Sequence, residues 1–411
     1  MQVYLVGGAV RDALLGIDVR ERDWVVVGAT REELLRAGYR EVGREFPVFL
    51  HPQTQEEYAL ARLERKVAPG YRGFAVEFGP EVTLEEDLGR RDLTINAIAQ
   101  AADGTLIDPY HGQRDLQARV LRHVSNAFIE DPVRVLRVAR FAARFATSGF
   151  TVAPETLELM RTMTGRGEVN ALVAERVWTE TQKALVQPAA SAFFKVLRAC
   201  GALKVIYPEI DALFGVPQTA KWHPEIDTGV HTLMVLDMAA TLTSDAGVRF
   251  AALVHDVGKA RTPPAEWPRH IGHEQRSVAI INALCDRLRV QAAFRDLAVL
   301  VARYHGIVHR AFELRPGTVV EFMEKADAFR RPERFADVLL ACEADGRGRA
   351  GFESAPYPQR SWLAEAFEAA AAIKPTAADL AGHPGPAIAE HVRRQRTSAI
   401  AALQSRLPDQ A

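Results

Sequence analysis

The feature that most constrains the fold of this chain is a change of sequence pattern near residue 125. Before it, β-branched runs alternate with glycines and turn residues, which predicts short strands at 3–6, 24–28 and 48–52. After it, apolar residues recur at helical spacing almost throughout. Because the strands are confined to the first part of the chain, we predict an α+β fold, with a mixed head and a mostly α-helical remainder.

The length of the chain indicates more than one domain. With 411 residues it exceeds an ordinary single domain. We expect a head at 1–125, a helical neck and body at 126–220, a histidine-rich domain at 221–330 and a helical tail at 331–411. Hydrophobic residues make up 48% and charged residues 25%, which excludes disorder, collagen-like fibre and coiled coil as the main state.

Features that the sequence lacks constrain the expected location of the protein, and its net charge is close to zero. It has no apolar run long enough to span a membrane and no signal-peptide pattern, and its three cysteines are widely spaced. An odd number of cysteines argues against a disulfide framework, so we expect a cytoplasmic protein without a membrane partner. The 51 basic and 52 acidic residues give a net charge of −1. A nucleic-acid binder of this composition would have to concentrate its basic residues locally.

Two features of the head could bind a metal–nucleotide complex. Gly7 and Gly8 separate a predicted strand from a helix whose first turn carries Arg11, an arrangement that either receives a phosphate or is an ordinary connection. Glu21 and Asp23 lie at the mouth of the next strand, where residues two apart point to the same face. Converging carboxylates repel unless a cation neutralises them, and oxygen ligands suit Mg²⁺; the alternative is a solvated acidic turn.

Further along the chain, arginines gather near acidic residues. Arg90 and Arg91 precede Asp92, and this triplet could hold a phosphate or stabilise the fold by ion pairs. Asp131 followed by proline predicts the start of a helix. That helix carries a row of basic side chains, Arg134, Arg137, Arg140 and Arg144. Since Asp131 and Arg134 are three residues apart, we expect them to be neighbours on the helix surface.

Histidines are concentrated in the third segment. Seven of the twelve fall between 223 and 309, and such clustering is typical of metal sites. Mixed imidazole and carboxylate ligands suit a transition metal better than Mg²⁺. A lone histidine is more often a surface or packed side chain, and we assign that ordinary role to His309, His383 and His391.

The motifs together resemble a known family. GGAVRD, the carboxylate pair before WVVVG, RRDLTINA, DPYHG and EDPVRVLRVARF occur in this order. The set is similar to the bacterial tRNA nucleotidyltransferases, the CCA-adding enzymes of the class shared with bacterial poly(A) polymerases. The resemblance covers nearly the whole chain and is close to Gram-negative members with a histidine-rich domain. It implies a polymerase-β-like nucleotidyltransferase head and template-independent addition of CCA to tRNA from CTP and ATP.

The resemblance also implies roles for single residues. Gly8 and Arg11 would hold the triphosphate, and Glu21 and Asp23 would hold the catalytic Mg²⁺ ions. The residues implied to contact the nucleotide are Arg91, Arg137 and Arg140. The family's metal pair is usually two aspartates, so the glutamate at position 21 departs from the pattern and lengthens one ligand arm by a methylene.

Selection of the base is implied for Asp131 and Arg134. A carboxylate accepts hydrogen bonds and a guanidinium donates them. The pair therefore matches the amino donor and neighbouring ring acceptor that cytosine and adenine both present. Guanine and uracil offer the reverse order, which places acceptor against acceptor and donor against donor. The sequence thus predicts that C and A are chosen without a template strand, and that a small shift of the pair accompanies the change from C to A.

The histidine-rich segment resembles the HD phosphohydrolase superfamily. The residues that correspond to its metal ligands are His231, His255, Asp256 and, as the candidate for a later aspartate, Asp345. His273 and His305 could bind a second metal or a substrate phosphate. The resemblance implies phosphatase, 2′-nucleotidase and 2′,3′-cyclic phosphodiesterase activities with a transition metal such as Ni²⁺.

Three alternatives stay open at this point. The chain could be a poly(A) polymerase, which shares the head motifs but not the hydrolase-like domain. It could be an RNA-binding HD phosphohydrolase whose head is inactive, with Glu21 as the lesion. It could also be a tRNA-binding protein without catalysis. The sequence leaves the oligomeric state open between a monomer and a weak homo-oligomer.

Overall fold

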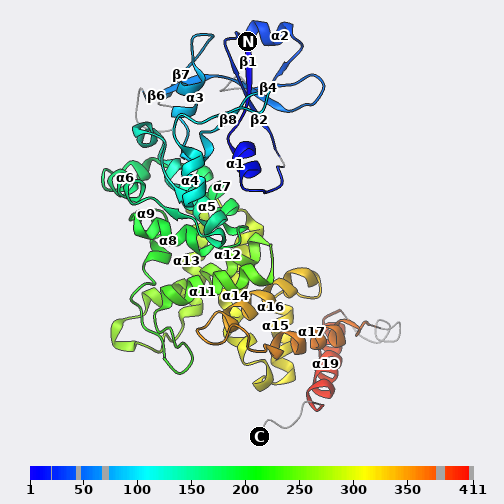
Figure 1. Ribbon diagram of the computed structural model, residues 1–411. Coiled ribbons are helices and arrows are strands. Elements are labelled where there is room, and N and C mark those ends of the chain that lie inside the picture. Colours follow the sequence, from blue (N-terminus) through cyan, green and yellow to red (C-terminus); the bar gives the residue numbers. More distant parts are fainter. Residues whose placement is uncertain (20, 43–47, 67–73, 376–384, 407–411) are drawn as a thin grey trace. The chain divides into compact units, whose positions relative to one another are not determined.

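The chain divides into two compact units, Met1–Ile206 and Tyr207–Ala411, which we call unit 1 and unit 2 (Figure 1). The computed structural model describes residues 1–19, 21–42, 48–66, 74–375 and 385–406. His383 therefore lies outside the described residues. The expected α+β class is confirmed, because the strands of the main sheet lie in the head and the later part is largely helical.

Unit 1 begins with a mixed sheet. Its strands are β1 (Gln2–Val6), β2 (Asp23–Val27), β3 (Arg40–Glu41), β4 (Val48–Leu50), β5 (Glu57–Leu60), β8 (Ala99–Gln100) and β9 (Leu106–Ile107). They are ordered β3-β4-β5-β2-β1-β8-β9. β2 lies between antiparallel β1 and parallel β5, in a register that pairs Asp23 with Glu57. The three predicted strands are present as β1, β2 and β4, with small shifts at their ends.

Hydrophobic residues pack on both faces of this sheet. Successive strand residues point to opposite faces. Val25 packs in a cluster with Leu88 on one face, and Val26 packs with Leu34 on the other. The helices of the head are α1 (Gly8–Leu14), α2 (Arg31–Arg36), α3 (Leu84–Gly89) and α4 (Gly112–Ala118). Asp23 shares the face of Val25, so the burial of Val25 determines the face on which the Asp23 carboxylate projects.

A second, two-stranded ribbon consists of β6 (Arg62–Lys66) and β7 (Phe74–Phe78), and β10 (Val120–Leu121) pairs with β11 (Thr151–Val152). The rest of unit 1 is built around α5 (Val133–Phe145), which packs against α7 (Ala174–Leu185) and α8 (Ser191–Ala199). The other helices of this part are α6 (Pro154–Gly165) and α9 (Ala202–Ile206). Asp131 is extended and lies before α5, and its Oδ1 accepts a hydrogen bond from the Val133 N–H at 3.0 Å. It thus supports the start of the helix, as the sequence predicts.

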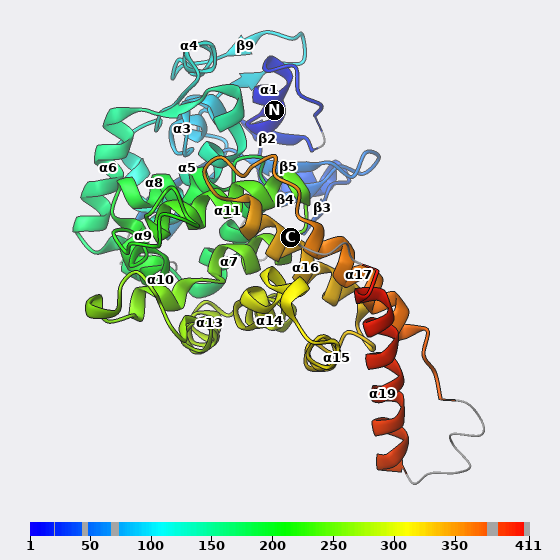
Figure 2. The same ribbon diagram turned by 90° about the horizontal axis from the view of Figure 1, so that it is seen from below.

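Unit 2 is helical in its described part. Its main helices are α11 (Thr228–Leu242), α12 (Ala246–Val254), α13 (His273–Leu288), α14 (Ala292–His309), α15 (Pro316–Lys325), α16 (Pro332–Arg347), α17 (Pro358–Ala371) and α19 (Gly385–Gln404). Asp227 and Asp245 cap α11 and α12, because each carboxylate accepts a hydrogen bond from a backbone N–H of the first turn. α12 packs against α11, α14 and α16, and Figure 2 shows α17 and α19 side by side.

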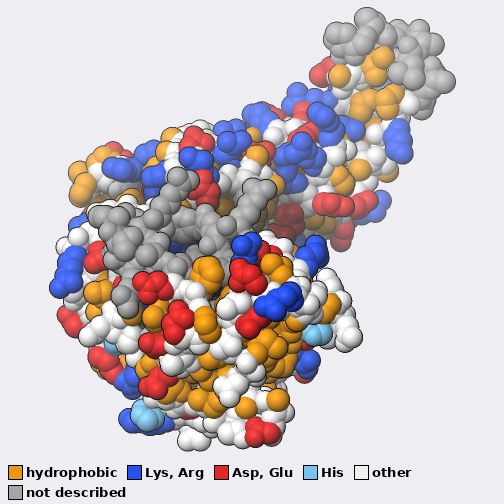
Figure 3. All heavy atoms as spheres, turned by 90° about the horizontal axis from the view of Figure 1, so that it is seen from above, with side chains coloured by type: hydrophobic (Ala, Val, Ile, Leu, Met, Phe, Trp, Pro, Cys, Tyr) orange, Lys and Arg blue, Asp and Glu red, His pale blue; other side chains and the backbone are white. Residues whose placement is uncertain are grey.

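The surface and the cysteines agree with the composition. Acidic and basic side chains are interspersed on the face that Figure 3 presents, as expected for a net charge of −1. Cys200, Cys285 and Cys342 are free and buried. None of the described helices combines the length and the apolar content that crossing a membrane requires.

Candidate active sites

A cleft of about 900 Å³ lies within unit 1. Its lining includes Gly7, Gly8 and the charged residues Arg11, Glu21, Asp23, Glu57, Arg62, Arg90, Arg91, Asp92, Asp131, Arg134, Arg137, Arg140, Arg144 and Arg176. All the residues that the sequence suggested for nucleotide addition are in this set. Tertiary structure therefore brings the glycine turn, the acidic pair and the basic helix to one place.

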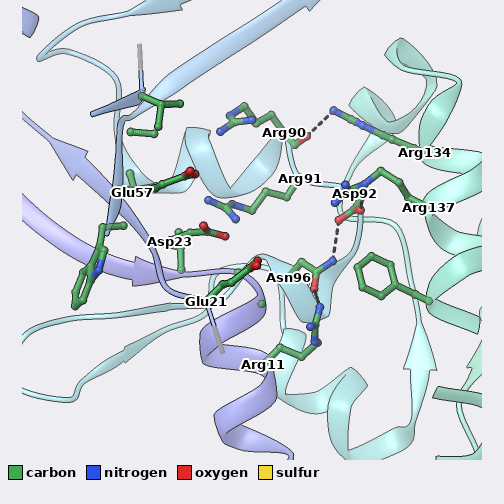
Figure 4. Close-up of a pocket in the computed structure, with 18 of the residues that line it drawn as sticks. Arg11, Glu21, Asp23, Glu57, Arg90, Arg91, Asp92, Asn96, Arg134 and Arg137 are labelled. Carbon is green, nitrogen blue, oxygen red and sulfur yellow. Dashed lines mark hydrogen bonds and ion pairs between the residues drawn. The ribbon is translucent and has the colours of Figure 1, made fainter. Parts of the chain in front are cut away.

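The acidic side of the cleft carries three carboxylates. Asp23 is the first residue of β2 and Glu21 lies two residues before it, and Glu57 is the direct partner of Asp23 across the parallel β2–β5 pair. Figure 4 shows the three side chains on the same side of the cleft, with the Arg91 guanidinium extending toward them. Glu57 was not singled out in the sequence, because nothing in its local pattern identifies the strand with which it pairs.

The electrostatics of Asp23 favour a bound cation. Burial raises the pKa of the Asp23 carboxyl, and the negative charge of Glu21 raises it further, while Arg91 opposes both effects. A divalent cation would remove the repulsion between these acids. Carboxylate oxygens are the ligands that Mg²⁺ prefers, so Glu21, Asp23 and Glu57 fit the metal that the sequence predicts.

The glycine turn leaves space for an arginine. Gly7 has a φ of 71°, in the left-handed region that favours glycine, and a Cβ there would lie 2.8 Å from Nη1 of Arg91. Arg11 is buried, and its Nη1 donates to Oδ1 of Asn96 at 2.5 Å. It also forms an ion pair with Asp12 at 2.8 Å. The turn thus leaves room for the Arg91 guanidinium beside the cleft, which Arg11 also lines.

Ion pairs hold the motif that contains Arg90, Arg91 and Asp92. Asp87 is fully buried and pairs with Arg90 at 2.7 Å and Arg91 at 3.2 Å. Asp92 accepts from Nε of Arg137 at 2.6 Å. Burial alone would raise the pKa of Asp92, but the Arg137 charge and a hydrogen bond from the Asn96 side chain hold it at about 2. Of the two interpretations left open by the sequence, ion pairing is present in the structure.

Asp131 and Arg134 both line the cleft and are neighbours, since the Arg134 N–H donates to the Asp131 carbonyl at 3.0 Å, but their side chains have other partners. Asp131 precedes α5 and accepts from Nη2 of Arg176 at 3.2 Å. Arg134 donates to the backbone carbonyls of Ala127 and Arg90, each at 2.6 Å. Asp131 has extended backbone angles and therefore lies just before the helix rather than within it. Arg176, on α7, was not suggested by the sequence.

The remaining arginines of α5 are also paired. Nε of Arg140 donates to Glu180 at 2.6 Å, and its guanidinium lies 4.6 Å from the ring centre of Phe141. Arg144 pairs with Asp12 at 2.8 Å. Their positions on one helical face follow from the spacing in the sequence, whereas their acidic partners come from distant segments.

Unit 2 contains a separate group of candidate metal ligands. Among the described residues, three sets offer ligand atoms that all lie within 4.8 Å of one another: His231 with His255 and Asp345, Asp256 with His273 and His305, and His223 with Glu225 and His231. Nε2 of His231 lies 3.1 Å from Oδ1 of Asp345, and Nε2 of His255 lies 3.6 Å from Oδ2. The structure thus brings together all the residues that the sequence suggested for this site, including Asp345.

These ligands lie on or beside five helices of unit 2, and His273 is the first residue of α13. His231 lies on α11 and Asp345 on α16, and His305 lies on α14. His255 directly follows α12, and Asp256 precedes the short helix η5 (Val257–Arg261). Nζ of Lys259 lies 2.5 Å from Oδ2 of Asp256 and donates to Gln218 at 2.6 Å.

The buried donor atoms of the unit 2 cluster suit a bound cation. Nε2 of His255 and Oδ1 of Asp256 are buried and make no hydrogen bond to the described residues. Burial would lower the pKa of His255, but the carboxylates of Asp256 and Asp345 raise it to about 10. A pair of carboxylates that retains a proton on an imidazole would also favour a metal ion in the same place. The mixed histidine and aspartate donors therefore fit a transition metal.

His309 was assigned an ordinary role from the sequence, but the structure places it at this site. Its Nε2 lies 2.6 Å from Oδ2 of Asp345, and its Nδ1 lies 2.8 Å from the Tyr357 hydroxyl. His391 is remote from the site in sequence and bonds Gln395 at 2.9 Å.

Three family models match the chain. They are the poly(A) polymerase head domain over residues 3–122, a probable RNA- and SrmB-binding site of polymerase A over 149–214, and the HD domain over 228–344. The chain is 63% identical to the multifunctional CCA protein of Thioalkalivibrio sulfidiphilus, with 98% of this chain and 99% of that protein covered. It is 62% identical to the one from Nitrosococcus oceani, with 97% and 98% covered.

Solved structures of CCA-adding enzymes share the fold. The Thermotoga maritima enzyme complexed with tRNA superposes with a TM-score of 0.63 at 19% identity, covering 100% of this chain and 88% of that one. The Bacillus stearothermophilus enzyme in complex with CTP gives 0.63 at 23% identity, covering 97% and 89%. A CCA-adding enzyme with ATP gives 0.66 at 20% identity, covering 97% and 86%.

Proposed function

The chain belongs to the family of the multifunctional CCA proteins and is a CCA tRNA nucleotidyltransferase with an HD phosphohydrolase domain; we propose that the cleft of unit 1 adds C, C and A in turn to tRNA from CTP and ATP. The observation that carries this proposal is the convergence of the carboxylates and arginines on one cleft. The 3′-hydroxyl oxygen of the tRNA attacks the α-phosphorus of the nucleotide in line, and pyrophosphate leaves.

Glu21, Asp23 and Glu57 are the residues that would hold Mg²⁺ in this reaction. Mg²⁺ supplies charge neutralisation for the attacking oxygen and for the leaving pyrophosphate. Arg91 extends toward the carboxylates and would contact the triphosphate, and Gly8 and Arg11 would contribute on the side of the glycine turn. Such transfers depend mainly on positioning and charge neutralisation, which this concentration of guanidinium groups supports.

We assign selection of the base to Asp131 and Arg134, with Arg137 and Arg140 beside the nucleotide. Asp131 offers an acceptor and Arg134 offers donors, which suits cytosine and adenine and opposes guanine and uracil. To read a base, Asp131 would exchange Arg176 for the amino group, and Arg134 would leave the backbone carbonyls that it now contacts. The tRNA would lie on the helical part of unit 1, held through its phosphates and its shape.

The test of this activity is extension of tRNA that lacks CCA. With CTP, ATP and Mg²⁺, the wild-type protein is expected to add three nucleotides and stop. Asp23→Ala should abolish addition while tRNA binding is retained, because the carboxylate holds the cation rather than the RNA. A long A-tail without C would identify a poly(A) polymerase instead. Failure of the wild-type protein to incorporate CTP, with hydrolysis intact, would identify an inactive head.

A second activity is assigned to the metal site of unit 2. His231, His255, Asp256 and Asp345 would hold a transition metal such as Ni²⁺, and His273 and His305 would hold a second ion or a substrate phosphate. The metal supplies Lewis acidity for water to attack a phosphoester. The activities expected are those of a phosphatase, a 2′-nucleotidase and a 2′,3′-cyclic phosphodiesterase. Removal of damaged RNA ends before CCA is rebuilt would be a use for them.

The two activities should separate by mutation. His255→Ala or Asp256→Ala should abolish hydrolysis of 2′,3′-cyclic AMP in the presence of Ni²⁺ and leave CCA addition intact, because both ligands lie in unit 2. Asp23→Ala should have the opposite effect. If each variant lost both activities while remaining folded, a protein with two separate active sites would be excluded.

A further inference from the structure

His309 and Tyr357 form a hydrogen-bonded chain that ends on Asp345. His309 is the last residue of α14, and Tyr357 immediately precedes α17. Nε2 of His309 lies 2.6 Å from Oδ2 of Asp345, and the Tyr357 hydroxyl oxygen lies 2.8 Å from Nδ1 of the same imidazole. Both distances are in the range of good hydrogen bonds.

The direction of the two bonds follows from the chemistry of the groups. The carboxylate of Asp345 is an acceptor, so the imidazole donates its Nε2–H to it. Nδ1 of the neutral imidazole is then an acceptor, and the phenol of Tyr357 donates to it. Burial raises the pKa of Tyr357, so the phenol keeps this proton. The chain therefore selects one tautomer of His309 and one orientation of its ring.

The backbone next to Asp345 is adapted to this arrangement. Gly346 follows Asp345, and a Cβ at that position would lie 2.6 Å from Cε2 of the Tyr357 ring. Glycine at this position is what allows the ring to lie against α16 and direct its hydroxyl at His309. The Asp345 side chain is only 5% exposed, so the direction of its carboxylate is set by these neighbours rather than by water.

The two oxygens of Asp345 have different surroundings. Oδ1 lies 3.1 Å from Nε2 of His231, which belongs to the candidate metal ligands. Oδ2 accepts the short bond from His309 and also lies 3.6 Å from Nε2 of His255, the other histidine of this ligand set. A carboxylate held on one oxygen presents the other in a defined direction, and partners of this kind raise metal affinity without touching the metal.

We infer that His309 and Tyr357 are positioning residues that hold Asp345 in the orientation of a metal ligand and thereby tune the metal affinity of the phosphohydrolase site. The inference rests on the proposed function of unit 2, in which Asp345 is a ligand. The role of His309 and Tyr357 differs from that of the metal ligands, because neither residue belongs to the sets of converging ligand atoms found among the described residues.

The experiment measures metal binding directly on the full-length protein. The metal-free protein is titrated calorimetrically with Ni²⁺, and the absorption spectrum of the Co²⁺-loaded protein reports ligand geometry. Tyr357→Phe removes only the hydroxyl and is expected to weaken Ni²⁺ binding about tenfold and to change the Co²⁺ spectrum. The kcat for cyclic phosphodiester hydrolysis at subsaturating Ni²⁺ should fall, while KM for the phosphodiester stays the same.

Two substitutions at position 309 separate hydrogen bonding from packing. His309→Leu fills the space without a donor and should weaken Ni²⁺ binding about tenfold or more. His309→Gln carries an amide N–H near the place of Nε2 and should restore binding to within about threefold of wild type. Tyr304→Phe is the matched control, because Tyr304 is a buried tyrosine of α14 that packs on Phe322. It should leave Ni²⁺ binding unchanged.

The Ni²⁺ affinities of the variants decide whether the inference holds. Circular dichroism and the thermal unfolding of unit 2 check that every variant is folded. Ni²⁺ affinities of Tyr357→Phe and His309→Leu within about twofold of wild type would overturn it, as would a glutamine variant as weak as the leucine variant. If the wild-type protein bound no metal at all, the proposed hydrolase function would fail first, and the role of both residues would fall with it.

Discussion

At the scale of single residues, the local sequence pattern of Glu57 does not reveal that it lies next to Asp23. The alternation of residues 57–64 predicts a strand, but it does not identify the neighbouring strand or the register. The parallel pairing of β2 with β5 places Glu57 directly opposite Asp23 and so adds a third acid to the predicted pair. The sequence identified the two acids that are two residues apart and missed the one that comes from a different strand.

Replacement of Glu57 by glutamine tests whether the third acid takes part in nucleotide addition. Glu57→Gln removes a negative charge opposite Asp23 and should reduce kcat for CTP incorporation about 100-fold, since a carboxylate that helps to hold Mg²⁺ contributes several kcal/mol. Glu56→Gln is the neighbouring control, because Glu56 accepts from the Trp24 indole at 3.0 Å and should have little effect. Equal activities of the two variants would remove Glu57 from the reaction.

Asp92 should contribute to stability in a pH-dependent way. Its pKa in the folded state is about 2, below the usual 3.8. A lowered pKa means that the stabilisation is complete above pH 4 and is lost as the pH falls toward 2, by about 2 kcal/mol. The free energy of unfolding of Asp92→Asn should therefore lie below that of the wild type at neutral pH, and the difference should shrink in acid. Urea denaturation across this pH range measures the difference, and a gap independent of pH would contradict the assignment.

Among elements, the start of α5 and the positions of three strands could be predicted because their signals are local. Asp131 bonds the first turn of α5, and Asp227 and Asp245 cap the helices that follow them in the same way. The partner of Arg134 could not be predicted in this way. Its long side chain reaches the carbonyls of Ala127 and Arg90, and the approach of those segments depends on how the head packs on α5.

The contact between η5 and α13 depends on Gly258. Its N–H donates to Oγ of Ser277 at 2.8 Å, and a Cβ at Gly258 would collide with the His273 carbonyl and lie 2.5 Å from the Ser277 nitrogen. Gly258→Ala should therefore displace η5, lower the stability of unit 2 by about 2 kcal/mol and reduce hydrolysis, with CCA addition retained.

A matched glycine gives the control for this prediction. Gly317 lies in the first turn of α15, and a Cβ there would have no neighbour within 4 Å. Gly317→Ala should be neutral or stabilise the protein by up to about 1 kcal/mol, because alanine favours the helix. Thermal unfolding compares the two variants, and equal melting temperatures would contradict the steric role of Gly258.

At the scale of the whole molecule, the described part of each compact unit contains a candidate site, and ligand binding at each site should shift thermal unfolding. CTP with Mg²⁺ should stabilise unit 1 and Ni²⁺ should stabilise unit 2, each by about 2.7 kcal/mol at a concentration 100 times its Kd. Asp23→Ala should remove the shift caused by CTP and Mg²⁺ only, and His255→Ala should remove the shift caused by Ni²⁺ only. Loss of both shifts in one variant would contradict separate sites.

The sequence by itself determined the α+β class, the order of the motifs, the paired acids at the entrance to β2 and the clustering of histidines, because these depend on spacing over a few residues or on composition. The tertiary structure decided which distant groups meet: Glu57 opposite Asp23, Asp131 beside Arg176, Asp345 beside His231, and Tyr357 bonded to His309. The reason is physical. Local propensities act along the chain, whereas contacts between separate elements are selected by packing and by the need to pair buried polar groups.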